Sequence, residues 1–391
     1  MLKMRLNLIL PVVDPDQFQP VAVCPYAACS GRHFKPHQEV AKAVRDSHYE
    51  QVRARRYRCL KCQRTFRVYP QGIQASQVSQ RVKGIAVMLY LLGLSYGAVE
   101  LMTEALGVYY SKTSVYQAVQ AAAQAVPGLK RSQIVEGYRT PAIGGDLTWV
   151  RCNGKWLPIG VIVDPLQGLV LSIDPLAGED AQSLQEWMAP IAAQVGAQVL
   201  VSDDADAFKH AADQSGLQQQ VCKNHVVRNT EQLITSLSAA LQNHPDGSLR
   251  RLNLSADQAL ADLKRLGEAI HSRQPQEQME MQALYERYAA APAPKPGQSA
   301  SLAYRLRNLF LDRWNLWPRL TFYRTWTDPQ GQPILDGTNN ADERAIGWWV
   351  KERYRSMRGY KREKSVLNVS RLIAYCGNHL QQGLDLATLV A

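Results

Sequence analysis

Between residues 143 and 174 the apolar positions form three runs separated by short polar turns. The runs consist mainly of Val, Ile, Leu and Trp, and the turns Asn153-Gly154 and Asp164-Pro165-Leu166-Gln167-Gly168 divide them at the spacing of β-hairpins. This pattern predicts three consecutive strands. Downstream, the apolar pattern predicts helices over 179–193 and 205–214 and strands over 197–202 and 218–222.

Acidic residues occur at two positions in these apolar strands. Asp146 lies inside the first strand, and Asp203-Asp204 follows the fourth. Burying a carboxylate in a strand is costly unless a metal ion or another cation pairs with it, whereas an Asp at a sheet edge or strand start can face water. Three strands, a helix and a fourth strand with these acids resemble the RNase H-like nucleotidyltransferase fold. That resemblance implies that the first and fourth strands are neighbours and that their acids face each other.

A third acidic candidate, Glu343, lies at the start of a predicted helix that continues to residue 357. Asn340 precedes it by three residues, which is the spacing of a capping box, so Glu343 is either a helix cap or a third carboxylate of the same site. Residues 351 and 358 share its helical face. We expect the cations of segment 351–364 to contact phosphates, and these include Lys351, Arg355, Arg358 and Lys361.

Two short cysteine pairs lie near the start of the chain. Cys24 and Cys29 form one pair, and Cys59 and Cys62 form the other. Four thiolates at such spacings are typical of a structural zinc site, although His33, His37 and His48 are possible substitutes and four unrelated reduced cysteines are the alternative. Basic and aromatic residues alternate around the second pair, so a small zinc ribbon that binds the DNA backbone is predicted. Its candidate DNA contacts are Arg55, Arg56, Arg58, Lys61 and Arg64.

Residues 78–125 change to a helical pattern. Gly93 and Gly107 are placed as helix stops, and Ser95 and Ser111 as N-caps, so three short helices are predicted. They match a helix-turn-helix whose last helix would enter the major groove. The candidate base contacts on that helix are Lys112, Ser114 and Gln117. The alternative is a helical bundle used for packing or dimerisation.

Residues 230–335 do not fit a small nuclease core. They contain helical patterns at 249–270 and 277–291, a Pro/Ala-rich linker at 291–301 and a run with Trp314, Trp317 and Trp326. We interpret this region as an insertion. The tryptophans are spaced with apolar residues at roughly helical intervals, which favours a role in its core over base stacking.

The charge distribution agrees with a polyanionic partner. The formal net charge is +11 and the pI is near 9.3. Residues 31–83 carry a net charge of +10 and residues 344–371 carry +7, so the remainder is acidic overall. Positive charge at both ends fits two DNA-facing surfaces. The pattern predicts neither a signal peptide nor a membrane span, and seven cysteines with C-x-x-C spacing favour a reducing compartment.

Together these motifs resemble bacterial insertion-sequence transposases of the DDE class, close to the mutator-like branch. The resemblance rests on the cysteine pairs, the helices around Ser95 to Tyr116, Asp146, VLVSDDADAFKHA, the C-x-x-H of Cys222 and His225, and TNNADER. It implies a zinc ribbon (1–75), an all-α helix-turn-helix domain (76–138), an α/β RNase H-like catalytic domain (139–229 and 336–391) and a helical insertion (230–335).

The resemblance also implies that Asp146, Asp203 and Glu343 hold two Mg²⁺ or Mn²⁺ ions. Such a pair, about 3.5–4 Å apart, activates water for DNA cleavage and then the freed 3′-hydroxyl for strand transfer. The expected partners are double-stranded DNA, at transposon ends and targets, and further copies of the chain in a homo-oligomer, at a cytoplasmic, nucleoid-associated location in a bacterium. A non-catalytic DNA-binding regulator and a metal-dependent nuclease without strand transfer are the alternatives.

Overall fold

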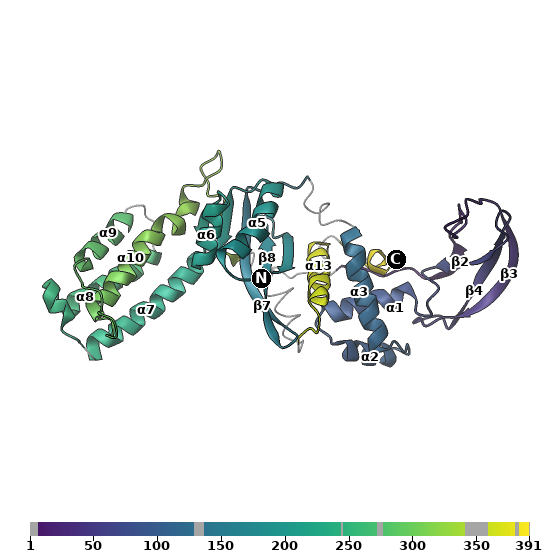
Figure 1. The fold of residues 1–391 in the computed structure, drawn as a ribbon, viewed down its shortest axis with the longest axis horizontal. Helices are drawn as coiled ribbons and strands as arrows, with labels where there is room; N and C mark the ends of the chain where they lie inside the picture. Colours follow the sequence, from purple (N-terminus) through teal and green to yellow (C-terminus); the bar gives the residue numbers. More distant parts are fainter. Residues whose placement is uncertain are drawn as a thin grey trace.

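The computed structural model describes residues 7–128, 137–243, 245–271, 277–340, 359–379 and 383–390. The molecule is elongated (Figure 1). A central β-sheet lies between a helical insertion at one end and a layer of helices that leads to a β-ribbon at the other. Within the described ranges, no helix combines the length and the apolar character needed to cross a membrane.

The central sheet is mixed and has five strands in the order β11-β10-β7-β8-β9. Strands β7, β8 and β9 pair antiparallel, and β10 runs parallel to both β7 and β11. At the β7–β8 turn, Asn153 and Gly154 have φ values of 50° and 78°, as a type I′ hairpin requires. The strands lie where the apolar runs predict them: β7 (Ala142–Cys152), β8 (Lys155–Val163), β9 (Val170–Pro175), β10 (Val199–Ser202) and β11 (Gln218–Val221).

The two faces of the sheet are covered by different helices. On one face, Ile143 and Leu200 pack against α5 (Ala181–Val195) and α6 (Asp206–Gln214). On the other face, Val150 and Val161 belong to a second core that includes α13 (Glu363–His379). Successive strand residues point to opposite faces, so odd positions of β7 face α5 and even positions face away from it.

A layer of three helices precedes the sheet in sequence, and its ends match the predicted caps. The hydroxyl of Ser95 accepts a hydrogen bond from the Ala98 amide at 3.1 Å. Gly93 and Gly107, which follow the first two helices, adopt φ values of 111° and 79°. The helices are α1 (Gln80–Leu91), α2 (Tyr96–Ala105) and α3 (Lys112–Gly128).

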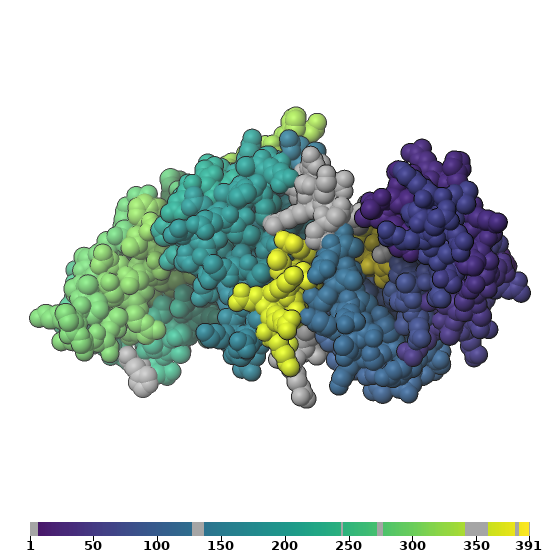
Figure 2. Space-filling model, turned by 45° about the vertical axis from the view of Figure 1, so that its right-hand side comes forward, coloured from purple at the N-terminus to yellow at the C-terminus, as the bar shows by residue number. Residues whose placement is uncertain are grey.

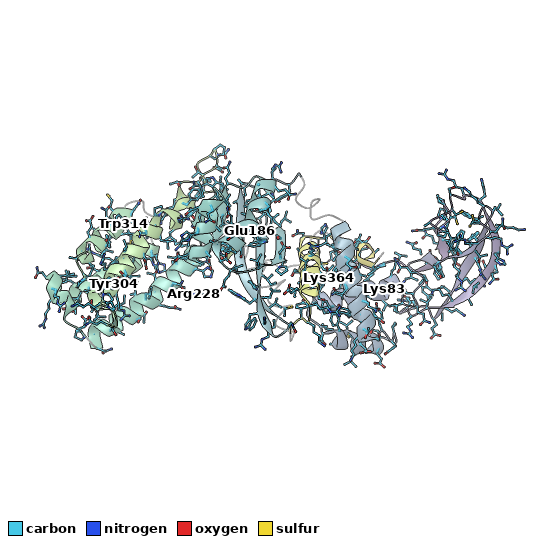
Figure 3. The ribbon with its side chains drawn as sticks, in the orientation of Figure 1. Lys83, Glu186, Arg228, Tyr304, Trp314 and Lys364 are labelled. Carbon is cyan, nitrogen blue, oxygen red and sulfur yellow. The ribbon has the colours of Figure 1, made fainter. Side chains whose placement is uncertain are left out.

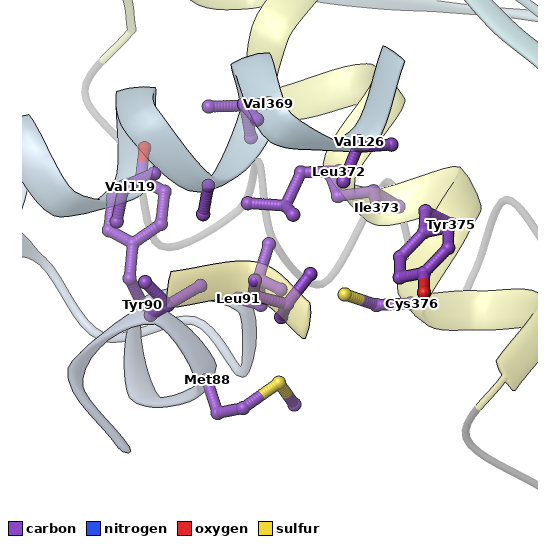
Figure 4. Packing of buried hydrophobic residues seen from close by; sticks show 14 of the residues in the cluster. Met88, Tyr90, Leu91, Val119, Val126, Val369, Leu372, Ile373, Tyr375 and Cys376 are labelled. Atoms are coloured by element: carbon purple, nitrogen blue, oxygen red, sulfur yellow. The ribbon is translucent and has the colours of Figure 1, made fainter. Parts of the chain in front are cut away.

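The helical layer and the sheet share one hydrophobic core. Figure 4 shows Leu91 of α1 and Val119 of α3 packed around Leu372 and Ile373 of α13. The same cluster contains strand residues of β7, β8 and β9. Both ends of the chain join it: β1 (Leu8–Ile9) pairs in parallel with β12 (Leu384–Asp385), and α14 (Ala387–Val390) packs against α1 and α3. In Figure 2 the C-terminal residues, in yellow, lie between the sheet and the helical layer.

The segment before α1 forms a ribbon of short strands around the four clustered cysteines. Its three-stranded sheet has the order β3-β4-β5, and a further pair, β2 and β6, lies beside it. The buried carboxylate of Asp46 joins the ribbon to α1, because it accepts hydrogen bonds from the Ser79 hydroxyl and the His48 amide. The strands are β2 (Asp14–Phe18), β3 (Phe34–Ala43), β4 (Gln51–Cys59), β5 (Thr65–Val68) and β6 (Pro70–Gln71).

The insertion after β11 is helical, and its tryptophans are structural. Trp317 is buried in its core, and Trp314 stacks on Tyr285 with ring centroids 5.4 Å apart. Trp314 lies well away from the sheet (Figure 3). The interpretation as core residues of the insertion is thus confirmed for Trp314 and Trp317, whereas Trp326 packs against Ala142 and Val201 of the sheet. The elements are α7 (Lys223–Asn243), η1 (Ser248–Leu252), α8 (Ala256–His271), α9 (Glu277–Tyr288), α10 (Leu302–Leu320) and η2 (Phe322–Arg324).

Because Leu372 is fully buried between the helical layer and the sheet, Leu372→Ala should lower the free energy of unfolding by about 2–5 kcal/mol. Leu101→Ala is the control, since Leu101 is 68% exposed on α2 and its loss should change stability by less than about 0.5 kcal/mol. Denaturant unfolding followed by circular dichroism measures both variants. Equal effects would contradict a core shared by the two regions.

Candidate functional site

Asp146 lies in β7, and Asp203 follows the end of the neighbouring strand β10. The parallel register pairs Val199 with Ala142 and Val201 with Gly144. Extending it by two residues places Asp203 beside Asp146, on the face that Ala142 and Val201 share. Strand β10 ends at Ser202, so Asp203 follows its carboxyl end directly. The strand pairing thus directs two acids that are far apart in sequence toward the same part of the sheet, if the register continues beyond Val201.

Asp146 lies between two apolar clusters on its face of the sheet. On one side, Ala142 and Val201 pack with Leu335 from the segment after η2. On the other, Val150 belongs to the core that contains α13. Asp146 itself is half-buried, and its Oδ1 accepts a hydrogen bond from the Leu147 amide at 2.7 Å. Partial burial between two apolar clusters makes a bound cation more favourable than it would be in open solvent.

The two adjacent acids after β10 have different partners. Oδ1 of Asp203 accepts a hydrogen bond from the Ala205 amide at 3.1 Å. Asp204 instead forms ion pairs with Lys209, at 2.8 Å, and with Arg313 of the insertion, at 3.8 Å. Burial lowers the pKa of Lys209, but its bonds to Asp204 and Asp206 outweigh burial and raise it. The Asp204 carboxylate is therefore already neutralised by protein cations, which favours Asp203 as the metal ligand.

Two other acids of the sheet, Asp164 and Asp174, accept hydrogen bonds from groups within the protein. Asp174 pairs with Gly160 on the face opposite Asp146, where it accepts hydrogen bonds from Ser172 and from Trp187 Nε1. Asp164 accepts bonds from the Tyr138 hydroxyl and from the Leu166 amide of its turn. The predicted third acid, Glu343, lies outside the described residues, as do Lys351, Arg355 and Arg358.

The C-x-x-H motif holds the segment that precedes Glu343 in sequence. The Asn339 amide donates a hydrogen bond to Cys222 Sγ at 3.2 Å, and the Lys223 amide donates one to the Gly337 carbonyl at 2.9 Å. Burial raises the pKa of Cys222, but hydrogen bonds with His225 and the Asn339 backbone outweigh it and lower the pKa. The Cys222 amide also bonds to the Ser202 carbonyl at 2.7 Å. These contacts join the end of β10 to residues 337–340.

The four predicted zinc ligands meet in the ribbon. Sγ atoms of Cys24, Cys29, Cys59 and Cys62 all lie within 4.8 Å of one another. The Cys24–Cys62 and Cys29–Cys59 sulfur distances are 3.8 and 3.7 Å. Four thiolates around one zinc, each about 2.3 Å from it in a tetrahedron, are about 3.8 Å apart. Within the described ranges, this is the one group of three or more side chains arranged to hold a metal.

The surroundings of the cysteines also fit a metal-thiolate centre. Backbone amides of Cys62 and Lys61 bond to the Cys59 thiol, which lowers its pKa to about 7 despite burial. Gly31 donates its amide to Cys29 Sγ at 3.4 Å, and a Cβ at Gly31 would lie 2.6 Å from Cys59 Sγ. All seven cysteines are free thiols. The ribbon can therefore hold one structural Zn²⁺ through four thiolates.

One face of the ribbon concentrates positive charge, and of its four cations Arg56 donates a hydrogen bond to the Thr65 hydroxyl at 3.1 Å. The register places Arg56 opposite Arg67 and Lys35 opposite Arg58, and residues opposite each other share a face. Like charges in direct cross-strand pairs destabilise a sheet, and a bound polyanion would relieve that repulsion. Arg58, Arg67 and Lys35 are exposed. We call these four residues the cationic face. Lys35 was not among the sequence candidates, because only the strand register reveals it.

The remaining candidates of the ribbon have partners within the protein. The Arg55 guanidinium lies over the Phe18 ring, 4.0 Å from its centroid, and forms an ion pair with Glu39 at 3.8 Å. Arg64 lies over Tyr26 at 4.9 Å. Lys61 donates a hydrogen bond to the Ser30 hydroxyl at 2.6 Å. These cations are less available to a polyanion than those of the cationic face.

On α3, the predicted recognition helix, the candidates differ in exposure. Lys112 and Gln117 are exposed, whereas Ser114 is half-buried and its hydroxyl lies 2.9 Å from that of Ser111. One turn after Gln117, Gln120 contacts α13, where Asn368 Nδ2 donates a hydrogen bond to Gln120 Oε1 at 2.8 Å. Lys112 and Gln117 are thus the two candidates on this helix that a DNA groove could reach.

Comparison with models of known protein families gives no match for this chain, and comparison with curated proteins gives none either. The functional assignment therefore depends on the residues and their placement.

Purified full-length protein should contain about one equivalent of zinc, because the four thiolates form a closed site. Cys59→Ala should remove the metal and unfold the ribbon, since a segment this small and polar depends on metal binding for its stability. Elemental analysis and the circular dichroism spectrum measure the two effects. The control is Cys376→Ala, which removes a core thiol in α13 and should retain the zinc. Zinc-free wild-type protein with an intact ribbon would contradict the site.

Proposed function

We propose that this protein is a DNA transposase of the DDE class, which binds the ends of a mobile element and catalyses metal-dependent strand cleavage and strand transfer. The observation that supports this most directly is the parallel register of β7 and β10, which, continued two residues beyond Val201, sets Asp203 beside Asp146 on one sheet face. The strand order β11-β10-β7-β8-β9 makes the first and fourth strands of the domain neighbours, as the resemblance to the RNase H-like fold implies. The resemblance and the placement of the acids thus agree.

In this proposal the carboxylates of Asp146 and Asp203, with Glu343 as the third, hold Mg²⁺ or Mn²⁺. Hard cations such as Mg²⁺ prefer carboxylate oxygens. Two such ions, held by three carboxylates, would activate the oxygen that attacks the phosphate and would stabilise the negative charge on the oxygen that leaves it. The protein's own part is to hold the carboxylates in a fixed geometry. The sheet does this for Asp146 through strand pairing and for Asp203 through the turn that its side chain caps.

The separate modules supply the DNA contacts of the proposed function. The ribbon and α3 lie on the side of the sheet where α13 packs (Figure 1). The ribbon carries the cationic face, and α3 carries the exposed Lys112 and Gln117. Lys361 is exposed just before α13. Phosphate contacts from such cations position a duplex, and base contacts from α3 would select the sequence.

Asp146→Asn and Asp203→Asn should each reduce cleavage by at least about a hundredfold, because loss of a metal ligand removes several kcal/mol of transition-state stabilisation. Binding to the same DNA should persist, since cations make the phosphate contacts. The measurement is strand cleavage and joining with Mg²⁺ or Mn²⁺, on DNA that carries the sequences flanking the coding region. Cleavage without joining would favour a nuclease, and neither activity in the wild type would favour a regulator.

Asp204→Asn is the matched control for Asp203→Asn. It should retain cleavage but unfold more easily, by about 1–3 kcal/mol, because the buried Arg313 keeps its bond to the Thr230 hydroxyl but loses its ion pair. If Asp204→Asn abolished cleavage at temperatures where it stays folded and Asp203→Asn did not, the roles of the two acids would be exchanged.

Arg58→Gln should weaken binding to all duplex sequences alike and reduce the slope of log K against log salt by about one, as expected for one lost phosphate contact. Arg55→Gln is the control on the same strand, because its side chain lies on the opposite face and has partners in Phe18 and Glu39. Fluorescence anisotropy at several salt concentrations measures both. An equal change in slope for the two variants would contradict the cationic face as the contact surface.

A further inference from the structure

We propose that the end of the β7–β8 hairpin binds unpaired nucleobases, which stack on Trp149 and Trp156 while Arg151 and nearby lysines contact the phosphates. This inference rests on the proposed function in one respect, because it takes the bound single strand to be DNA. The residues concerned take no part in the zinc site, the acidic pair or the cationic face.

The strand register places both indoles on one face of the hairpin. Trp149 pairs with Pro158 and Arg151 pairs with Trp156, and directly opposite residues share a face. This face belongs to the side of the sheet that α5 covers. Helix α5 covers this face as far as Gly160, because a Cβ at Gly160 would lie 2.5 Å from the ring of Trp187 in α5. Beyond it, Trp149 is 45% exposed and Trp156 is 64% exposed.

The hairpin is held in place although its outer face is open. On the inner face, Val150 and Cys152 are buried in the shared core. At the end of β7, the Tyr360 amide donates a hydrogen bond to the Arg151 carbonyl at 2.7 Å, and the Asn153 amide donates one to the Tyr360 carbonyl at 2.8 Å. The exposed rings therefore sit on a fixed framework. A preorganised aromatic surface loses little conformational entropy when a ligand stacks on it.

The charge around the two rings complements a nucleic acid strand. Between Asp146 and Asp164 the sequence contains Arg151 and Lys155 and no acidic residue. Tyr360 is followed by Lys361 and Arg362, both exposed, and then by the acidic Glu363 and by Lys364. The Arg151 guanidinium lies 5.2 Å from the centroid of the Trp156 ring. Aromatic rings beside cations are the arrangement by which proteins bind single strands, because bases stack while phosphates meet the charges.

Duplex DNA does not fit the two rings, because its bases are already stacked on one another. The ligand class is therefore an unpaired stretch of DNA, such as a frayed or cleaved end. Trp149 follows Asp146 by three residues on the same strand, a rise of about 10 Å. It lies on the opposite face from Asp146, so a strand running from the acids would reach the rings around the edge of β7. Within the described residues, β10 stops pairing with β7 at Gly144, and Tyr360 bridges Cys152 further along β7.

The test compares single-stranded and duplex oligonucleotides of the same sequence, in EDTA, by fluorescence anisotropy with the full chain. The double variant Trp149→Ala with Trp156→Ala should bind the single strand at least tenfold more weakly, since stacking contributes about 1–3 kcal/mol per base. Its duplex affinity should stay within about twofold of the wild type. Replacing both tryptophans by Phe should restore most of the single-strand affinity, because the aromatic face is retained.

Leu233→Ala is the control for loss of an exposed apolar side chain, because Leu233 is 43% exposed on α7 in the insertion. Unchanged single-strand affinity in the double alanine variant would overturn the inference while duplex binding and cleavage still support the proposed function. Duplex binding that fails in the wild type would instead overturn the proposed function. If the double variant dissociated an oligomer in sedimentation experiments and left single-strand affinity unchanged, the surface would be an interface between copies of the chain.

Discussion

The parallel pairing of β10 with β7 is the constraint on which the rest of the structure depends. Parallel neighbours need a crossover, and α5 provides it while it covers one face of the sheet. The register of that pairing decides which residue after β10 stands beside Asp146. A shift by one residue would direct the Asp203 side chain to the opposite face. Strand β10 is paired on both of its edges, with β7 and with β11, so a shift would disrupt two sets of backbone hydrogen bonds.

The shared hydrophobic core gives the helical layer a fixed position relative to this sheet. Leu372 and Ile373 of α13 contact both the strands and the helical layer, so α3 is joined to the sheet through packed side chains. At its other end, the helical layer is tied to the ribbon through Asp46 and the N-cap of α1. A duplex bound by the ribbon and α3 would therefore have a defined position relative to Asp146. A flexible linker would leave that position undetermined.

Much of the fold could be predicted from the sequence because its elements follow local patterns. The alternation that predicts β7 to β10, the Asn153-Gly154 turn and the cap at Ser95 all act over a few residues. Contacts set by tertiary packing could not be predicted in this way. Lys35 joins Arg58 only through the register of β3 and β4, and Arg313 reaches Asp204 from a helix about 110 residues later in the chain. That Arg55 and Arg56 lie on opposite faces of the ribbon could be predicted from the sequence, since adjacent residues of a strand point to opposite faces.

The adjacent acids after β10 show how one strand end can serve two purposes. If the alternation of the strand continues, Asp203 shares the face of Val201 and Asp146, while Asp204 turns toward α6. Lys209 of α6 and Arg313 of α10 meet the Asp204 carboxylate there, and Arg313 also donates a hydrogen bond to the Thr230 hydroxyl at 2.8 Å. The insertion is thereby anchored one residue from the acidic pair. Most of the insertion lies away from the sheet (Figure 1). A movement of α10 would nevertheless shift Asp204 through its ion pair with Arg313, and with it the adjacent Asp203.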